Sequence, residues 1–184
     1  MRGILQAFDR LVTGMAYLSG LLFLLASFYI TADVVGRKFF GVSSAVTDEI
    51  GGYALALGAM WAMAYALRTG GHVRIDVLLP HLPSGAQAAL NYLALSVMAL
   101  FASVVAVYAW GLAWDSFTGD ARAMSSLQTP LFVPQGLMAT GLTALGLEAL
   151  AILVTGLAES VRLGRLTPPE PLPREPGAGD GGRA

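Results

Sequence analysis

The sequence predicts an all-α integral membrane protein with four transmembrane helices and a short interfacial segment between the second and the third. Two observations lead to this fold class. Of the 184 residues, 55% are hydrophobic and 12% are charged, whereas an average soluble domain has about 25% charged residues. Uninterrupted apolar segments also recur four times, each near the roughly 20 residues that cross a hydrocarbon core about 30 Å thick. The chain carries too few charges to cover a soluble surface.

The first apolar segment runs from Leu11 to about Val35 and follows two basic residues, Arg2 and Arg10. A secretory signal also begins with basic residues, but its apolar core has about 7 to 15 residues. This segment is much longer, and no clear small-residue cleavage site follows it. We therefore interpret it as a retained membrane anchor.

The second apolar segment extends from about Ile50 to Leu67 and is the shortest of the four. Thr47, Asp48 and Glu49 precede it. They place a hydrogen-bond acceptor and two negative charges where a helix exposes unpaired N–H groups and the positive end of its dipole. The second helix is expected to begin at these residues.

The third and fourth segments cover Ala88 to Trp114 and about Leu131 to Ala158. Ser84 and Gln87 have the spacing of a capping box, which predicts a helix start at Ser84. Proline at the first helical position loses no needed donor. Either Thr129-Pro130 or Val133-Pro134 is therefore expected to open the fourth helix.

Two segments are not expected to cross the membrane. The stretch from His72 to Leu82 is short, contains Pro80 and mixes apolar with charged residues, which is typical of an interfacial segment. The chain from residue 166 to residue 184 is rich in proline and glycine, a composition typical of disorder. We therefore expect a transmembrane domain over residues 1–165 and a disordered cytoplasmic tail over residues 166–184.

The basic residues predict the orientation. With both termini in the cytoplasm, eight of the eleven Lys and Arg residues lie inside and three, Arg37, Lys38 and Arg122, lie outside. An excess of basic residues on the cytoplasmic side is the general rule for membrane proteins. Both termini are therefore expected in the cytoplasm.

The chain lacks the residues that several classes of function need. The chain has no cysteine, which excludes thiolate metal sites and thiol nucleophiles, and its net charge of -1 argues against nucleic-acid binding. His72 and His81, the two histidines, both fall in the inner loop, whereas a haem within a helical bundle needs axial ligands at depth. No catalytic motif is present. We expect no enzyme activity and no cofactor.

Glu148 falls near the bilayer centre when residues are counted from either end of the fourth segment. A carboxylate at that depth is a candidate functional group by default. It also belongs to a mostly small four-residue stripe, which favours close helix packing: Gly136, Thr140, Ala144, Glu148, Ile152 and Gly156. A hydrogen bond or ion pair within the bundle or to a partner subunit is the favoured reading. A place beside a water-filled crevice and a role in ion coupling are the alternatives.

Charged residues also gather at both ends of the first two helices. On the outer side, Asp33 and Arg37 stand four residues apart and could pair, near Asp48 and Glu49. These residues would serve as interfacial anchors or as a docking surface for another protein. On the inner side are Arg68, His72 and Asp76. Gly70-Gly71 breaks a continuous helix there, so a folded-back turn in which Arg68 meets Asp76 is expected.

The order of these features resembles the small membrane subunit, the DctQ-like family, of tripartite ATP-independent periplasmic (TRAP) transporters. The resemblance rests on DVVGRKFF (residues 33–40) and on TDEIGGYALALGAMWAMAYALRTGGHVRIDVL (residues 47–78). The run from Arg68 through His72-Val73 to Ile75-Asp76, placed after the second span, is the most specific part.

What the resemblance implies is a component of a secondary transporter in the bacterial inner membrane. In such systems a large permease subunit holds the substrate and sodium sites, and a periplasmic binding protein delivers an organic acid such as a dicarboxylate. The small subunit braces the large one and helps dock the binding protein in sodium symport. Two other readings stay open from the residues alone: a haem-bearing membrane anchor of a redox enzyme, and a self-standing tetraspan channel.

Overall fold

The computed structural model describes residues 2–70, 82–164 and 166–169, with side chains from residue 7 onward. Four α-helices follow one another: α1 (Arg2–Phe40), α2 (Thr47–Arg68), α3 (Ser84–Thr118) and α4 (Phe132–Leu163). Each of them is long enough and apolar enough to cross a membrane. The prediction of an all-α membrane protein with four transmembrane helices is confirmed. The predicted interfacial segment, which includes His72 and Asp76, falls almost entirely outside the described residues.

Helices α2 and α3 start where the sequence placed them, but the predicted caps do not form. Helix α2 begins at Thr47 with Asp48 and Glu49 in its first turn. The N-cap position belongs to Val46, and the buried hydroxyl of Thr47 has no hydrogen-bond partner among the described residues. Thr47 already lies inside the helix, so the prediction that it caps α2 is wrong.

Helix α3 shows the same pattern, whereas α4 begins between the two proline pairs that were predicted to open it. Helix α3 begins at Ser84 as predicted, but Gln87 donates its side-chain amide to the carbonyl oxygen of Leu82 at 2.9 Å, and no capping box forms. Helix α4 begins at Phe132, so of the two predicted proline pairs Val133-Pro134 lies in the first turn. Pro130 lies before the helix, where it pairs with Arg122 in an isolated antiparallel bridge.

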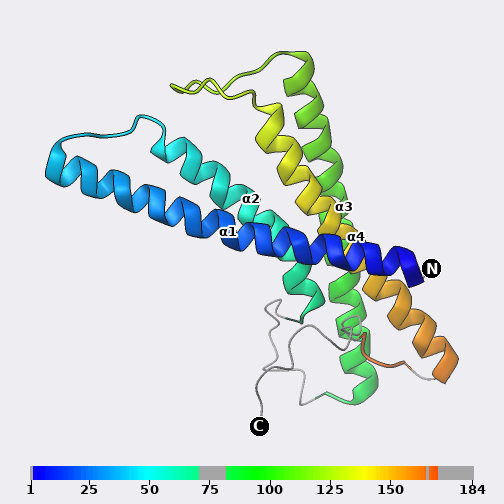
Figure 1. Ribbon diagram of the computed structural model, residues 1–184. Helices are drawn as coiled ribbons and strands as arrows, with labels where there is room; N and C mark the ends of the chain where they lie inside the picture. The colour runs from blue at the N-terminus through cyan, green and yellow to red at the C-terminus, as the bar shows by residue number, and fades with distance from the viewer. Residues whose placement is uncertain (1, 71–81, 165, 170–184) are drawn as a thin grey trace, which may run out of the picture.

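The helices form two antiparallel hairpins, α1–α2 and α3–α4 (Figure 1). The hairpins cross near the N-terminal part of α1 and diverge toward their outer connections, residues 41–46 and residues 119–131. Between the hairpins, the most extensive contact is that of α2 with α4. The first hairpin thus meets the second near the N-terminal part of α1 and the middle of α3 and α4.

The apolar core lies at this crossing and contains residues from all four helices. Its buried members are Val12, Ala64, Leu67, Leu95, Ala99, Ala102, Ala144, Leu145, Ala149 and Ile152. Half of them are alanines, which let helix backbones approach closely. Away from the crossing, α1 contributes little to the core.

Glycines mark the closest helix contacts. A methyl group on Gly58 of α2 would stand 2.7 Å from the ring of Phe23, and one on Gly141 of α4 would stand 2.8 Å from the carbonyl carbon of Met60. Both distances are too short for real Cβ contacts. Helix α2 therefore packs closely against α1 at Gly58. On α4 the closest approaches fall at Gly141, next to the predicted stripe, and at Gly156 within it, where a methyl group would stand 2.8 Å from the hydroxyl oxygen of Tyr92.

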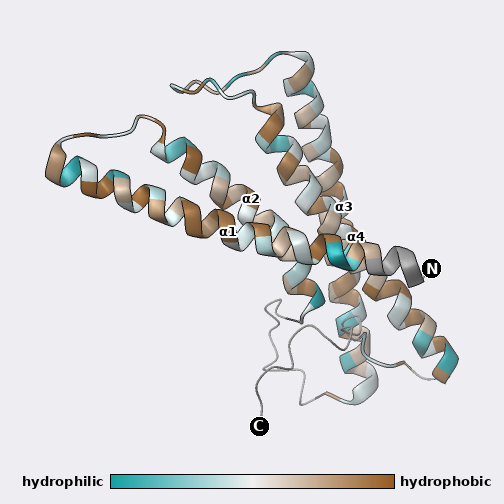
Figure 2. Cartoon of the chain, in the orientation of Figure 1, coloured by the Kyte–Doolittle hydropathy of each residue, from teal (hydrophilic) through white to brown (hydrophobic). Residues whose placement is uncertain are grey.

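The helices are apolar along much of their length, as the brown segments of the ribbon show (Figure 2), and many large apolar side chains are exposed. In the most apolar 18-residue window of each helix, 44% of residues are buried in α4 but 11% in α1. Helix α4 is therefore the central helix of the bundle. Most of α1 is left to contact lipid or another protein.

The chain after α4 turns back toward the bundle. Gly164 ends the helix with φ +63°, a left-handed conformation that glycine adopts without strain. The backbone N–H of Thr167 then donates to Ser160 Oγ at 3.1 Å, and the hydroxyl groups of Ser160 and Tyr92 lie 3.1 Å apart. Residues 166–169 of the predicted tail thus lie against α4, and residues 170–184 fall outside the described part.

Candidate functional site: an outer polar turn and a buried ion cluster

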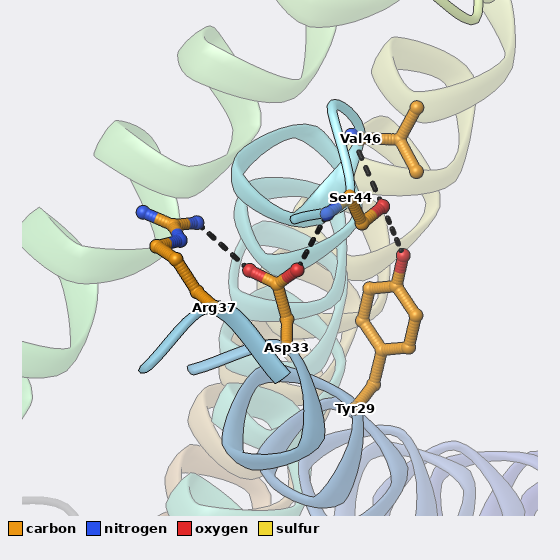
Figure 3. A network of polar contacts seen from close by, with 5 residues as sticks. All are labelled: Tyr29, Asp33, Arg37, Ser44 and Val46. Carbon is orange, nitrogen blue, oxygen red and sulfur yellow. Dashed lines mark hydrogen bonds and ion pairs between the residues drawn. The ribbon is translucent and has the colours of Figure 1, made fainter. Parts of the chain in front are cut away.

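The outer end of the first hairpin is organised around Asp33 (Figure 3). Its Oδ1 accepts a hydrogen bond from the backbone N–H of Ser44 at 2.6 Å, and its Oδ2 pairs with Arg37 Nη2 at 2.8 Å. The predicted pairing of Asp33 with Arg37 is present in the structure. The Asp33 side chain is 4% exposed and that of Arg37 is 60% exposed, so the carboxylate faces the turn and the guanidinium faces outward.

Ser44 connects this carboxylate to a second set of contacts. Its hydroxyl group lies 2.9 Å from that of Tyr29 and accepts a hydrogen bond from the backbone N–H of Val46 at 3.4 Å. Gly41, with φ +67°, allows the chain to reverse after α1. Two side chains of α1 therefore hold the turn that leads into α2.

The acidic residues at the start of α2 have different surroundings. Asp48 is exposed, whereas Glu49 is half-buried and accepts a hydrogen bond from the hydroxyl of Tyr53 at 2.8 Å. The hydroxyl groups of Ser125 and Thr129, in the connection between α3 and α4, lie beside the Glu49 carboxylate. Glu49 thus faces the second hairpin, and Asp48 faces away from the protein.

At the inner end, Arg68 lies between two carboxylates from two other helices. Its Nη1 lies 2.5 Å from Asp9 Oδ1 of α1, and its Nε lies 3.9 Å from Glu148 Oε1 of α4. The Arg68 side chain is 11% exposed. Three helices therefore meet at one guanidinium. The expected contact of Arg68 with Asp76 stays a prediction, because Asp76 and His72 lie outside the described residues.

Glu148 is fully buried, with 0% of its side chain exposed. Neither carboxylate oxygen has a hydrogen-bond donor among the described residues, so the guanidinium of Arg68 supplies the nearest compensation. An isolated charge in such a place would be very costly. The arrangement matches an ion pair within the bundle, which is one of the two contacts that the sequence analysis favoured for Glu148.

Sequence reasoning missed Asp9 and the role of Trp61. Asp9 is separated from Arg68 by most of two helices, and no local signal links them. The indole N–H of Trp61 donates to the carbonyl oxygen of Leu137 at 2.8 Å and lies 3.1 Å from Thr140 Oγ1. This contact fixes α2 to α4 on the outer side of the ion cluster.

Chemically, these residues can join helices and present charge. Among the residues that the structure describes, no group of three or more His, Asp and Glu side chains could hold a metal ion. The outer turn offers charges of both signs to an approaching molecule, since Arg37 and Asp48 are exposed. In the inner cluster, Glu148 is fully buried, whereas the side chain of Asp9 is 34% exposed.

Comparison with known proteins places this architecture in a family. The profile of the family described as "Tripartite ATP-independent periplasmic transporters, DctQ component" matches residues 14–159, which include most of all four helices. A relative, the "Ectoine TRAP transporter small permease protein TeaB" of Halomonas elongata, is 29% identical over 150 residues, 76% of this chain and 75% of the relative. No solved structure matches. The chain belongs to the DctQ component family of tripartite ATP-independent periplasmic transporters, and it is a small membrane subunit of a transporter rather than an enzyme.

Proposed function

We propose that this chain braces the large permease subunit of its transporter and helps dock the periplasmic binding protein during sodium-driven uptake of an organic acid. In this proposal it lies in the bacterial inner membrane with both termini in the cytoplasm. The turn of residues 41–46 and the connection of residues 119–131 then face the periplasm. The observation that carries the proposal is how little of α1 its own chain covers.

One face of α1 has the character of a helix-packing surface. It carries a shallow, open groove, formed by side chains of α1 alone, that combines small and hydroxyl-bearing residues with aromatic and aliphatic ones: Gly20, Phe23, Leu24, Ser27, Phe28 and Thr31. Helices associate in membranes through such small and polar residues, because lipid offers no hydrophobic advantage to burying an apolar side chain. A helix of the large permease subunit is the proposed occupant.

The outer charges support the docking role. Arg37 and Asp48 are exposed at the end of the first hairpin, and Lys38 lies beside them in the chain. Charges of both signs at the rim of an interface mainly affect the rate and register of association. A soluble protein that arrives from the periplasm would meet these residues first.

The buried groups give no support to a substrate site in this chain. Glu148 would repel a substrate carboxylate, and it is closed off by its own helices. Within the described part of the chain, the cation beside it is Arg68, which is already shared with Asp9. We therefore assign substrate and sodium binding to the large subunit.

The bracing role is tested by filling the groove. In Ser27→Phe or Thr31→Phe, an added ring would occupy the groove, and co-purification of the large permease subunit should fall while this chain still accumulates in the membrane. Val107→Phe is the matched control, since Val107 is 70% exposed on α3 and lies outside the groove. If both groove variants co-purify with the large subunit as well as Val107→Phe does, the groove is not part of the interface.

The proposal also includes the class of substrate that the transporter carries. The relative is named for ectoine, and the family resemblance implies an organic acid such as a dicarboxylate. Uptake of labelled ectoine and of labelled dicarboxylates by the complete complex would separate the two. Accumulation that needs a sodium gradient is expected, and uptake that is unchanged without one would contradict sodium symport.

A further inference from the structure

The two hairpins contact each other mainly through α2 and α4. Near the start of α2, Glu49 also lies beside the hydroxyl groups of Ser125 and Thr129 in the connection between α3 and α4. Two polar contacts join α2 to α4 directly: Trp61 donates to the carbonyl oxygen of Leu137, and Arg68 meets Glu148. Trp61 and Arg68 are seven positions apart, which corresponds to about 10 Å along a helix.

The first of these contacts coincides with the closest approach of the backbones. A methyl group on Gly141 would stand 2.8 Å from atoms of both Met60 and Trp61. The two helices are in direct backbone contact there. Toward the inner end, Ala64 and Leu67 of α2 belong to the same apolar core as Ala144 and Leu145 of α4. The ion pair is the second specific contact between these two helices.

Burial makes this second contact hard to break. Glu148 is 0% exposed and has no hydrogen-bond donor among the described residues, so it depends on the guanidinium of Arg68. Removing one member of a buried pair leaves an uncompensated charge. Asp9 lies on the other side of the same guanidinium and brings the N-terminal part of α1 to this point.

We propose that the ion pair of Arg68 with Glu148 sets the angle at which the two hairpins cross, and thereby the separation of the outer turn (residues 41–46) from the outer connection (residues 119–131). Fourteen residues, or about 21 Å, lie between Trp61 and Thr47 at the outer end of α2. A rotation of about 10° about the contact at Trp61 would therefore displace Thr47 by about 4 Å. The inference does not depend on which protein contacts the outer residues.

A role in positioning differs from a role in stability alone. If the pair merely adds stability, a variant that still folds keeps the same distance between the outer segments. If the pair sets the angle, that distance changes in variants that remain folded. The measured distance is thus a readout that a merely stabilising contact would not change.

The experiment measures this distance by double electron–electron resonance in lipid nanodiscs. The chain has no cysteine, so Ser43→Cys and Ser126→Cys, both at exposed positions in the outer segments, can be spin-labelled without other changes. The distance is compared among the otherwise unchanged chain, Glu148→Leu, Arg68→Met and the double variant. Glu159→Gln, which removes an exposed acid of the same helix, is the control.

Both single variants should shift the mean distance by about 4 Å or broaden its distribution, and the double variant should match them rather than add their effects. Glu159→Gln should leave the distribution unchanged. Glu148→Gln removes the charge but keeps the shape of the side chain. It replaces Glu148→Leu in the comparison if that variant folds poorly. The proposal is overturned if folded single variants keep the distribution of the control, if one shifts and the other does not, or if the double variant shifts by the sum.

Discussion

The carboxylate of Asp33 on α1 accepts a hydrogen bond from the backbone N–H of Ser44, eleven residues further along the chain, at 2.6 Å. The same carboxylate holds the exposed guanidinium of Arg37. One buried side chain therefore shapes the turn between α1 and α2 and also fixes a charge on its outer surface. The turn and the charged surface cannot be altered independently.

Asp33→Ala is expected to destabilise the first hairpin more than Asp33→Asn does. Asparagine keeps an oxygen that can accept the Ser44 N–H and loses the pairing with Arg37, and pairs with an exposed partner add little stability. Alanine leaves a backbone donor without its acceptor. Thermal unfolding in detergent measures the order, with Asp48→Ala as the exposed control. Equal losses in the alanine and asparagine variants would contradict the role of the Ser44 contact.

Gly141→Ala and Gly136→Ala are expected to act in opposite directions. The new methyl group at position 141 would meet backbone and side-chain atoms of α2 at 2.8 Å, which should cost about 1 to 3 kcal/mol through overpacking. At position 136 nothing lies within 4 Å of such a group, so alanine should stabilise the helix by about 0.5 to 1 kcal/mol. Unfolding measured in the same detergent compares the two. A neutral Gly141→Ala would show that α2 and α4 are not in close contact.

Charge reversal at the start of α2 should distinguish the role of Asp48 from that of Glu49. Asp48→Lys alters an exposed charge and is expected to slow uptake when the binding protein is limiting, with assembly intact. More binding protein should recover much of the loss, and salt should modulate it. Glu49→Lys is expected to reduce folded protein as well, because Glu49 is half-buried and bonded to Tyr53.

Co-purification of the two membrane subunits, measured beside uptake, distinguishes docking from folding at these positions. Normal uptake by Asp48→Lys at every concentration of the binding protein would count against the docking surface. Loss of co-purification in the same variant would assign Asp48 to the fold of α2, where its charge also favours the helix N-terminus.

The orientation can be read with reporter fusions. Fusions after Pro83 and at Ala184 are both expected to report the cytoplasm, since eight of the eleven basic residues then lie inside. A fusion in the connection of residues 119–131 should report the periplasm and is the internal control. A periplasmic signal from either of the first two fusions would contradict the orientation.

Local patterns in the sequence predicted the structural features that depend on residues close together in the chain. The four helices, the start of α2 at Thr47 and the start of α3 at Ser84 follow from apolar length and from residues that favour helix ends. Helix lengths were underestimated, because polar ends such as Arg37-Lys38 continue the helix of α1. Basic residues at the C-terminal end of a helix interact favourably with its dipole.

Contacts between distant segments could not be predicted in the same way. Asp9 and Arg68 meet because the hairpins cross, and the crossing depends on packing at glycines such as Gly141. Successive residues of a helix point about 100° apart, so the neighbours Asp48 and Glu49 have different surroundings although the sequence presents them as a pair. Family membership then decides against the haem-bearing anchor and the self-standing channel, which the residues alone had left open.

Reconstituted uptake tests the central proposal, that this chain acts as the bracing and docking subunit of a larger transporter, most directly. Proteoliposomes would contain the large permease subunit with this chain, the large subunit alone, or this chain alone, each with the binding protein outside and a sodium gradient. We predict uptake in the first preparation and little in the other two. Full uptake by the large subunit without this chain, or uptake by this chain alone, would contradict the proposal.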